Sequence, residues 1–497
     1  MNLYKFKIEN WKFWVLIIFF VKVIVLSFFF IKATHSNYEI NGLAIIHNDF
    51  NEFIEPCNQL VEKGIYALKN SNQPYMSRLP GYGFPYIIYR FLFSEFISIQ
   101  LIVLSQIVLS SFAIYALGHI IFLFTKNKKY FYFTILIFPI FIFFNKEDLF
   151  TGPASFSYSA FILHLFFLQE FFNNKKNKHL LISGGFLTWL FFLRPFTLIF
   201  IGSLIVSLMM KRNFKLNHKI KILILLFLPF IFFEVVWTTR NYLNTGKFIP
   251  LQDAYVPGQE FKYTEGCDIN CTAKYSVVGV RKLVASWGGN SNWFIPGTEM
   301  HWFFNKNQES DDDYTFLKKN IFSKGFNKDS LQNLKSIFLA SFNPKINIEE
   351  RKKIDKNILQ KSKEFKNIFK VNHPFQFYFT SYILRFKNFL LINPTADWPG
   401  KSFMKSSLFY KIYKLLTIIL YFIITISTLA LTFINLKSIK EETLINYCVL
   451  SNIFLIMIFT AFIELSTFSY YITGFIGSFI VFLYFQAKKY PINGLKQ

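Results

Sequence analysis

The sequence is poor in acidic residues. It has 29 Asp and Glu against 54 Lys and Arg, which gives a formal net charge of +25. An excess of this size can indicate nucleic-acid binding. Here, however, the lysines punctuate long apolar runs, as they do in the cytoplasmic loops of membrane proteins. The charge distribution therefore favours a membrane protein and argues against nucleic acid as a partner.

Cysteine is also scarce. The chain has Cys57, Cys267, Cys271 and Cys448, and no group of Cys and His has the spacing of a structural zinc site. In an oxidising compartment Cys267 and Cys271 could pair with each other, or one of them with Cys57. Free thiols are an equal alternative, because connectivity cannot be deduced from sequence, so no disulfide is assigned.

Two further features are missing. The first apolar stretch is longer than the core of a signal peptide, and no small-residue cleavage site follows it, so we expect a membrane anchor. No internal repeat is visible, which argues against a transporter built from inverted repeats.

Long apolar runs dominate what is present. Hydrophobic residues make up 53% of the chain and aromatic residues 21%, with 68 Phe, a share that soluble domains seldom reach. Ten segments are apolar enough to cross a bilayer, near residues 11–32, 97–124, 130–145, 154–172, 179–194, 196–210, 220–238, 409–435, 445–465 and 471–487. We therefore predict an all-α polytopic membrane protein with about ten transmembrane helices.

The basic residues between these segments fall on one side. They lie at both ends of the chain and after the second, fourth, sixth and eighth predicted helices, whereas the loops around 146–153 and 466–470 are nearly free of Lys and Arg. The positive-inside rule then places both termini in the cytoplasm, with the chain in the inner (cytoplasmic) membrane.

This orientation divides the chain into three parts. Residues 1–238 form an N-terminal transmembrane module whose first outer loop is 33–96. Residues 239–408 form an outer, periplasmic domain of mixed secondary structure. Residues 409–497 supply the C-terminal transmembrane helices.

The second outer segment contains two helical patterns. Residues 347–370 have helical periodicity with a Lys-rich face. Residues 375–392 are aromatic, with Arg385 and Lys387 interspersed, which suits a helix lying in the plane of the membrane interface. The packed core of a small outer domain explains the second pattern equally well.

Carboxylates follow the first predicted helix in the stretch from His47 to Phe53. A carboxylate just outside the membrane can act as a general base or bind a divalent cation. Spacing alone favours a solvated acidic loop. A metal held by His47, Asp49 and Glu52 is left open and is not assigned.

Three basic side chains lie at membrane depth or near the outer edge. Such groups usually face a cavity or a partner, and the planar fork of Arg suits a phosphate. We expect Lys22, in the middle of the first helix, to snorkel to the nearer interface, which is also the simplest reading of Arg194. Arg240 is expected to be functional, because Trp237 and a Glu lie close to it on the same helix.

Several short motifs occur in one order along residues 49–390. They are Asp49-x3-Phe53-x3-Cys57-x2-Leu60-x3-Gly64-x-Tyr66, Arg78-Leu79-Pro80-Gly81-Tyr82-Gly83-Phe84-Pro85, Leu193-Arg194-Pro195, Trp237-x2-Arg240-Asn241-Tyr242, Gly246-Lys247-Phe248-Ile249-Pro250-Leu251, and Phe369-x3-His373-Pro374 followed by Tyr382 and Arg385. Together they resemble the GT-C superfamily of membrane glycosyltransferases. Within it, the chain is similar to the family 39 type, which includes the lipid A aminoarabinose transferase and the protein O-mannosyltransferases.

The resemblance implies a GT-C-like fold and a defined reaction. A sugar would pass from a polyprenyl-phosphate donor to a hydroxyl of a glycan, lipid or protein on the outer side of the membrane. Asp49 would be the catalytic carboxylate, and Arg240 and Arg194 would hold the donor phosphate. The resemblance specifies neither the sugar nor the acceptor. A polysaccharide polymerase or ligase, and a transporter or flippase of lipid-linked sugars, are the alternatives.

The accessory candidates are Glu52, Arg78, Tyr82, Glu147, Asp148 and Trp237. Glu147 or Asp148 would replace a Glu that relatives carry in the fourth helix, where this chain has Gly152-Pro153-Ala154. The last helix departs from the relatives' R-Y-x-x-P as well, since it reads Phe468-Ser469-Tyr470-Tyr471-Ile472.

Overall fold

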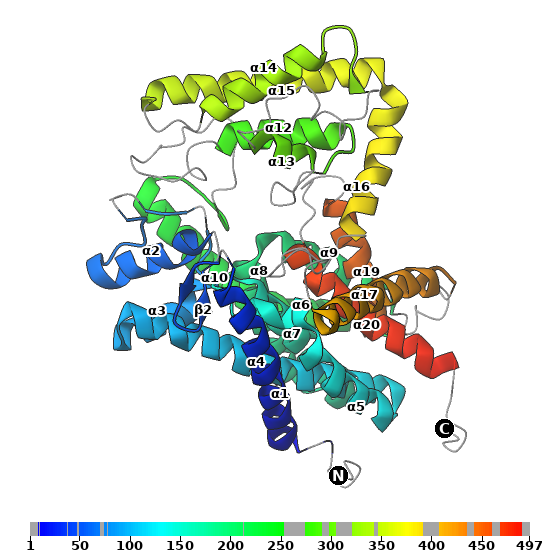
Figure 1. Ribbon diagram of the computed structural model, residues 1–497. Helices are drawn as coiled ribbons and strands as arrows, with labels where there is room; N and C mark the ends of the chain where they lie inside the picture. Colours follow the sequence, from blue (N-terminus) through cyan, green and yellow to red (C-terminus); the bar gives the residue numbers. More distant parts are fainter. Residues whose placement is uncertain are drawn as a thin grey trace. The chain divides into compact units, whose positions relative to one another are not determined.

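The chain divides into two units in its computed structural model (Figure 1). Unit 1 comprises Met1–Val256, Asp397–Leu455 and Tyr471–Gln497, and unit 2 comprises Pro257–Ala396 and Ile456–Tyr470. The structure describes residues 8, 10–36, 38–46, 49–69, 74–76, 78–211, 213–252, 274–290, 298–304, 321–341, 346–390, 407–434, 442–459 and 468–489.

Helices make up nearly all of the described structure. The first half of the chain contains α1 (Trp11–Thr34), β1 (Ile40–Asn41), β2 (Ala44–Ile45), α2 (Phe50–Lys63), α3 (Gly83–Leu92), α4 (Glu95–Thr125), α5 (Lys128–Ile137), η2 (Phe138–Ile140), α6 (Ile142–Asn145), η3 (Lys146–Asp148), α7 (Ala154–Asn174), α8 (Asn177–Leu193), η4 (Pro195–Leu198), α9 (Ile199–Met210) and α10 (Leu216–Thr245). The second half contains α12 (Lys274–Ser286), α13 (Glu299–Phe304), α14 (Lys328–Ala340), α15 (Ile348–Asn372), η7 (Gln376–Thr380), α16 (Ser381–Leu390), α17 (Leu408–Ile434), α19 (Thr443–Ile458) and α20 (Phe468–Lys489).

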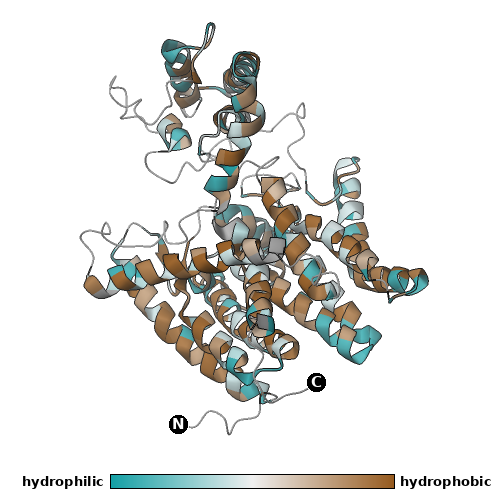
Figure 2. Ribbon diagram, turned by 90° about the vertical axis from the view of Figure 1, so that its right-hand side faces the viewer, coloured by the Kyte–Doolittle hydropathy of each residue, from teal (hydrophilic) through white to brown (hydrophobic). Residues whose placement is uncertain are grey.

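Five described helices are long and apolar enough to cross a membrane. They are Trp11–Thr34, Glu95–Thr125, Leu216–Thr245, Tyr410–Ala430 and Tyr471–Lys488, and the shorter Pro195–Met210 and Thr443–Ile458 are also apolar. Hydrophobic residues line most of their length (Figure 2). The prediction of a helical membrane protein with several spans is confirmed to this extent.

The segment 130–145, predicted as one membrane-crossing helix, is broken. Helix α5 ends at Ile137, and Pro139 interrupts the run because it offers no N–H to continue the helical bonding. The Asn145 amide donates to the carbonyls of Phe138, Pro139 and Phe141 at 2.8–2.9 Å, which satisfies oxygens that the break releases. The sequence predicted one helix because the prediction was based on the number of apolar residues and did not take this proline into account.

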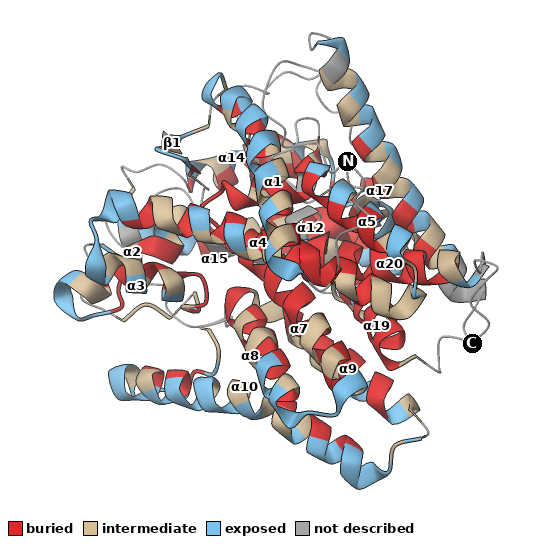
Figure 3. Ribbon diagram, turned by 90° about the horizontal axis from the view of Figure 1, so that it is seen from below, coloured by how far each residue is buried: buried red, intermediate tan, exposed pale blue. Residues whose placement is uncertain are grey.

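Helix α7 is the most enclosed helix of the N-terminal part, and it packs against α4 and α8. Its polar side chains Ser155 and His164 are fully buried and have protein partners, Asp148 for the first and Ser183 and Tyr447 for the second. Helix α10 differs, since most of its residues are exposed or half-buried (Figure 3). Such an outer helix would contact lipid over much of its surface.

Unit 2 has its own apolar core, formed by α12, α13, α14 and α15. Fully buried side chains such as Val280, Leu283, Leu334 and Phe338 belong to it. Helix α15 spans the residues 347–370 for which the sequence predicted helical periodicity. The mixed secondary structure expected for 239–408 is not seen in the described part of unit 2, which holds helices and one isolated bridge between Ser323 and Phe326.

Candidate functional site

Asp49 lies at the start of α2, directly before the first helical residue. The helix buries Phe53, Ile54 and Cys57 on one side and ends at Gly64, whose positive φ of 73° suits a residue without a side chain. This amphipathic helix holds Asp49 at its N-terminus, where the helix dipole favours a negative charge.

Arg78 binds two of the predicted carboxylates at once. Its Nη2 atom lies 3.2 Å from Oδ2 of Asp49 and its Nε atom lies 2.6 Å from Oε2 of Glu52. The guanidinium also stacks on the Phe53 ring at 5.0 Å from the centroid. The Asp49 and Arg78 side chains are 37% and 33% exposed, so this acidic–basic cluster is accessible to a ligand.

In this cluster Arg78 is charged and Tyr75 is neutral. Burial would lower the pKa of Arg78, but Glu52 and Asp49 outweigh it and raise that pKa above its usual range. Burial and the charge of Glu52 raise the pKa of Tyr75, which remains a neutral phenol. Arg78 thus carries its charge wherever the carboxylates are ionised.

The connection between α2 and α3, residues 64–82, joins this cluster to α10. Arg240 donates from Nη1 to the Tyr75 carbonyl at 3.2 Å and from Nη2 to the Tyr66 carbonyl at 3.1 Å. Its guanidinium lies 4.9 Å from the Trp237 ring and 5.4 Å from the Tyr66 ring. Tyr75 therefore binds Arg240 through its carbonyl and lies near enough to Glu52 for that carboxylate to raise its pKa.

Arg240 retains part of its donor capacity. A third bond runs from Nη1 to Oδ1 of Asn241 at 2.9 Å. Among the residues that the structure describes, these bonds use three of the five N–H donors of a guanidinium. The Nε–H and one Nη2–H have no hydrogen-bond partner within this described set.

The motif after α10 folds back on the helix. Trp237 donates its indole N–H to the Leu251 carbonyl, and the Leu251 amide donates to Oε1 of Glu234 at 2.7 Å. Asn241 donates to the Ile249 carbonyl at 2.9 Å. Leu251 has a φ of +55°, a strained value for a branched residue, which these contacts stabilise.

Arg194 ends α8, where its carbonyl accepts a bond from Oγ1 of Thr197 at 2.6 Å. The residues just before it touch the motif that begins at Arg78. A Cβ on Gly81 would lie 2.4 Å from the Phe192 carbonyl, and Trp189 donates to the Gly81 carbonyl at 2.9 Å. The structure thus brings the segments around Arg78 and Arg194 together.

Tyr82 lies in the same tight packing. Its ring is 5.7 Å from Phe53 and 5.9 Å from Phe156, and it is fully buried. Its hydroxyl has no hydrogen-bond partner among the described residues. Burial raises the pKa of Tyr82, so the hydroxyl is neutral.

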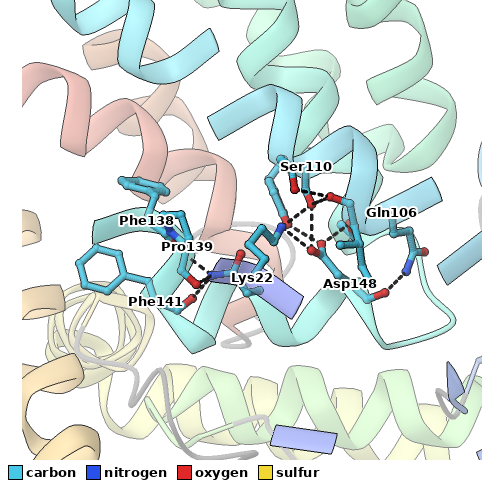
Figure 4. Close-up of polar contacts among 12 residues, drawn as sticks. Lys22, Gln106, Ser110, Phe138, Pro139, Phe141 and Asp148 are labelled. Carbon is cyan, nitrogen blue, oxygen red and sulfur yellow. Dashed lines mark hydrogen bonds and ion pairs between the residues drawn. The ribbon is translucent and has the colours of Figure 1, made fainter. Parts of the chain in front are cut away.

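Asp148 belongs to a separate buried group (Figure 4). Its carboxylate forms an ion pair with Lys22, and both side chains are fully buried. Ser110, Ser155 and Tyr158 donate to the same carboxylate at 2.8, 2.6 and 2.5 Å. These contacts define the Lys22–Asp148 node.

The Lys22–Asp148 node corrects one interpretation of the sequence. Lys22 was expected to snorkel to the interface, and this is wrong, because Asp148 offers a buried partner within reach of its amine. Glu147 lies 3.8 Å from Lys146.

The node is nevertheless linked to the cluster through the backbone. Ile45 in β2 pairs with Phe150, with bonds from the Ile45 amide to the Leu149 carbonyl at 2.8 Å and from the Thr151 amide to the Ile45 carbonyl at 3.0 Å. Ile45 is four residues before Asp49. The buried Lys22–Asp148 pair thus helps to fix the residues that follow Asp148. These residues bond to Ile45 and so hold the chain just before Asp49 in place.

The cluster does not have the donor set of a metal site. No group of three or more His, Cys, Asp and Glu is placed to hold a metal ion within the described ranges, and His47 lies outside them. The position between Asp49 and Glu52 is taken by the Arg78 guanidinium, a cation already.

Cys57 is a buried free thiol, which removes it from the disulfides considered. Burial raises its pKa, so it is inert in the folded chain. Cys267 and Cys271 lie outside the described residues.

The sequence analysis named Asp49, Arg78 and Arg240 as candidates but not the residues that join them. Tyr66 and Tyr75 act largely through backbone carbonyls, which carry no signal in the sequence. The sequence matches no protein-family model, no curated protein and no solved structure, so the contacts of this chain alone define the site.

Proposed function

We propose that the chain is a membrane glycosyltransferase that moves a sugar from a polyprenyl phosphate to an acceptor hydroxyl, with Asp49 as the general base. The supporting observation is the double contact of the 64–82 connection. At one end Arg78 binds Asp49 and Glu52, and at the other Arg240 binds the backbone carbonyls of Tyr66 and Tyr75. The Asp49 carboxylate and the Arg240 guanidinium, which are far apart in the sequence, therefore both contact the connection between α2 and α3.

The reaction needs a group that removes a proton. An alcohol is a poor nucleophile at neutral pH, so a positioned carboxylate that takes its proton as the C–O bond forms gives about 10²–10⁴-fold acceleration. The proton passes to Asp49, the acceptor oxygen bonds to the anomeric carbon, and the bond from that carbon to the phosphate oxygen breaks. Arg78 holds the carboxylate in one direction for this step.

The leaving polyprenyl phosphate gains a negative charge. The two unused N–H donors of Arg240 can bind its oxygens, and a pre-placed cation stabilises the charge without reorganisation. Arg194 is a second cation at the end of α8, beside the segment that carries Arg78. No step passes through a metal.

The membrane placement is part of the proposal. It comprises a GT-C-like arrangement of about ten spans in the inner membrane, both termini in the cytoplasm and the site on the outer face, as the basic loops indicate. The prenyl tail would lie between helices at the bilayer surface, with the sugar beside Asp49.

A transporter of lipid-linked sugars gains some support from the charged pair inside the bundle. However, Lys22 and Asp148 neutralise each other, and three hydroxyls already donate to the carboxylate. This node is satisfied as it stands, which favours a structural role. A polymerase or ligase would use the same lipid-linked donors.

Product analysis separates these functions. Full-length protein in lipid nanodiscs is incubated with a panel of polyprenyl-phosphate sugars and candidate acceptors, and products are identified by mass spectrometry. Release of free polyprenyl phosphate together with one new glycoside supports the proposal. Glycan chains of increasing length would show a polymerase instead. Translocation of an unchanged donor in proteoliposomes, without product, would overturn it.

A further inference from the structure

The exposed side chains change from polar to apolar near the junction of α15 and η7 in unit 2. From Lys353 to Lys370 the exposed positions of α15 are polar, and they include Lys353, Lys356, Gln360, Lys363, Glu364, Asn367 and Lys370. From Phe375 to Phe386 the exposed positions are aromatic or aliphatic. Phe375 is 72% exposed, Phe379 60% and Ile383 65%. The reversal takes place where α15 ends at Asn372 and the next helical stretch begins after His373.

In α16 the burial of polar and apolar side chains is reversed relative to a helix of a water-soluble domain. Ser381, Arg385 and Phe389 face inward and are buried, whereas Tyr382 and Ile383 face outward. Water favours the opposite arrangement, with the charge outside. Exposure of such residues is expected where the surroundings are apolar.

We infer that this exposed surface docks on a bilayer of anionic lipid. The docking face consists of Phe375, Tyr378, Phe379, Tyr382, Ile383 and Phe386. Aromatic and aliphatic side chains of this kind insert into the boundary between headgroups and acyl chains. The inference does not depend on the proposed transferase activity.

Basic residues border the docking face and explain the choice of anionic lipid. Lys370 lies 5.6 Å from the Tyr378 ring, and Lys387 is exposed next to Phe386. Lys and Arg near a membrane surface are attracted to acidic headgroups. Their long apolar stems can lie along the aromatic rings while the amines reach the phosphates.

The chain keeps this surface close to a membrane. Helix α16 ends at Leu390, and α17, which contains the candidate span Tyr410–Ala430, begins at Leu408. Fully extended, the intervening chain reaches at most about 60 Å. Docking therefore needs no large loss of translational entropy, and a modest affinity is enough.

Photocrosslinking tests the inference on the intact protein. A photoreactive phenylalanine analogue is placed at Phe379 or Ile383, and at the exposed polar positions Lys356 and Gln360 as matched controls. The four proteins are irradiated in nanodiscs of phosphatidylglycerol and in nanodiscs of phosphatidylcholine, and adducts are identified by mass spectrometry.

Lipid adducts at Phe379 and Ile383 are expected to exceed those at the controls by about tenfold in phosphatidylglycerol and to decrease in phosphatidylcholine. Adducts with another part of the chain or with a second copy would overturn the inference. Equal lipid labelling at all four positions would do the same, and equal labelling in the two lipids would overturn the assignment to anionic headgroups.

Discussion

Arg78 donates to Asp49 across 3.2 Å, and 29 residues separate the two in the sequence. The same guanidinium donates to Glu52 at 2.6 Å. One planar cation thus sets the directions of both carboxylates, which a point charge on a flexible stem cannot do.

Arg78→Lys is therefore expected to reduce transfer by about 100-fold, because a misplacement of about 1 Å at a reacting group costs this much. The charge is kept, so the fold should persist. The measurement is the single-turnover transfer rate in nanodiscs, together with the thermal unfolding midpoint. Arg90→Lys, which alters the Arg90–Glu62 pair of 2.7 Å, is the matched control. An equal loss in both variants would show that the effect is not specific to the cluster.

Arg240→Lys separates donor binding from support of the backbone. Lysine cannot reach the Tyr66 and Tyr75 carbonyls and a phosphate together, so donor affinity is expected to fall by about tenfold, which is about 1.4 kcal/mol. Donor affinity is measured by titration of the purified protein, with exposed Lys247→Gln as the control. If the unfolding midpoint decreases while donor affinity stays unchanged, Arg240 only supports the fold.

Close packing at Gly83 predicts that a substitution there lowers the unfolding free energy and that a second substitution restores part of it. A Cβ there would lie 2.2 Å from the Cys57 sulfur, so Gly83→Ala should destabilise the protein by about 1–3 kcal/mol. Cys57→Ala on that background removes the clashing atom and should restore part of the loss. Gly185→Ala in α8 is the control, because no atom lies within 4 Å of its added Cβ. Unfolding midpoints in detergent would contradict the packing if the two glycine variants behaved alike.

The Lys22–Asp148 node predicts strong coupling between two substitutions. Removing one partner leaves a buried charge, so Lys22→Met and Asp148→Asn should each cost about 3–5 kcal/mol of unfolding free energy. The double variant leaves no charge and should recover much of this cost. The double-mutant cycle is measured by denaturation in detergent. Additive losses would mean that the two groups do not interact.

The sequence predicted the helices better than the contacts between them. Apolar length was sufficient for α1, α4, α10, α17 and α20. It was insufficient at 130–145, because it counts apolar residues and ignores the single interruption at Pro139. The number of spans and the outer location of 239–408 stay predictions.

The candidate site was predictable in its parts but not in its assembly. Asp49 and Arg240 were recognisable as charged residues beside aromatic motifs. The role of Arg78 as the bridge between Asp49 and Glu52 depends on how the 64–82 connection folds, which no local pattern specifies. The prediction for Lys22 was wrong because its partner Asp148, in η3, is more than a hundred residues away, and only the packing of α1 and η3 against α4 brings the two together.

Asp49→Asn tests the central claim most directly. The amide keeps the size of the carboxylate and can still accept from Arg78, but it cannot take a proton. The single-turnover transfer rate should fall by about 10²–10⁴-fold while donor affinity and the unfolding midpoint stay close to those of the unchanged protein. Glu62→Gln, on the same helix, should leave the rate unchanged. Normal turnover by Asp49→Asn would contradict the assignment of Asp49 as the base.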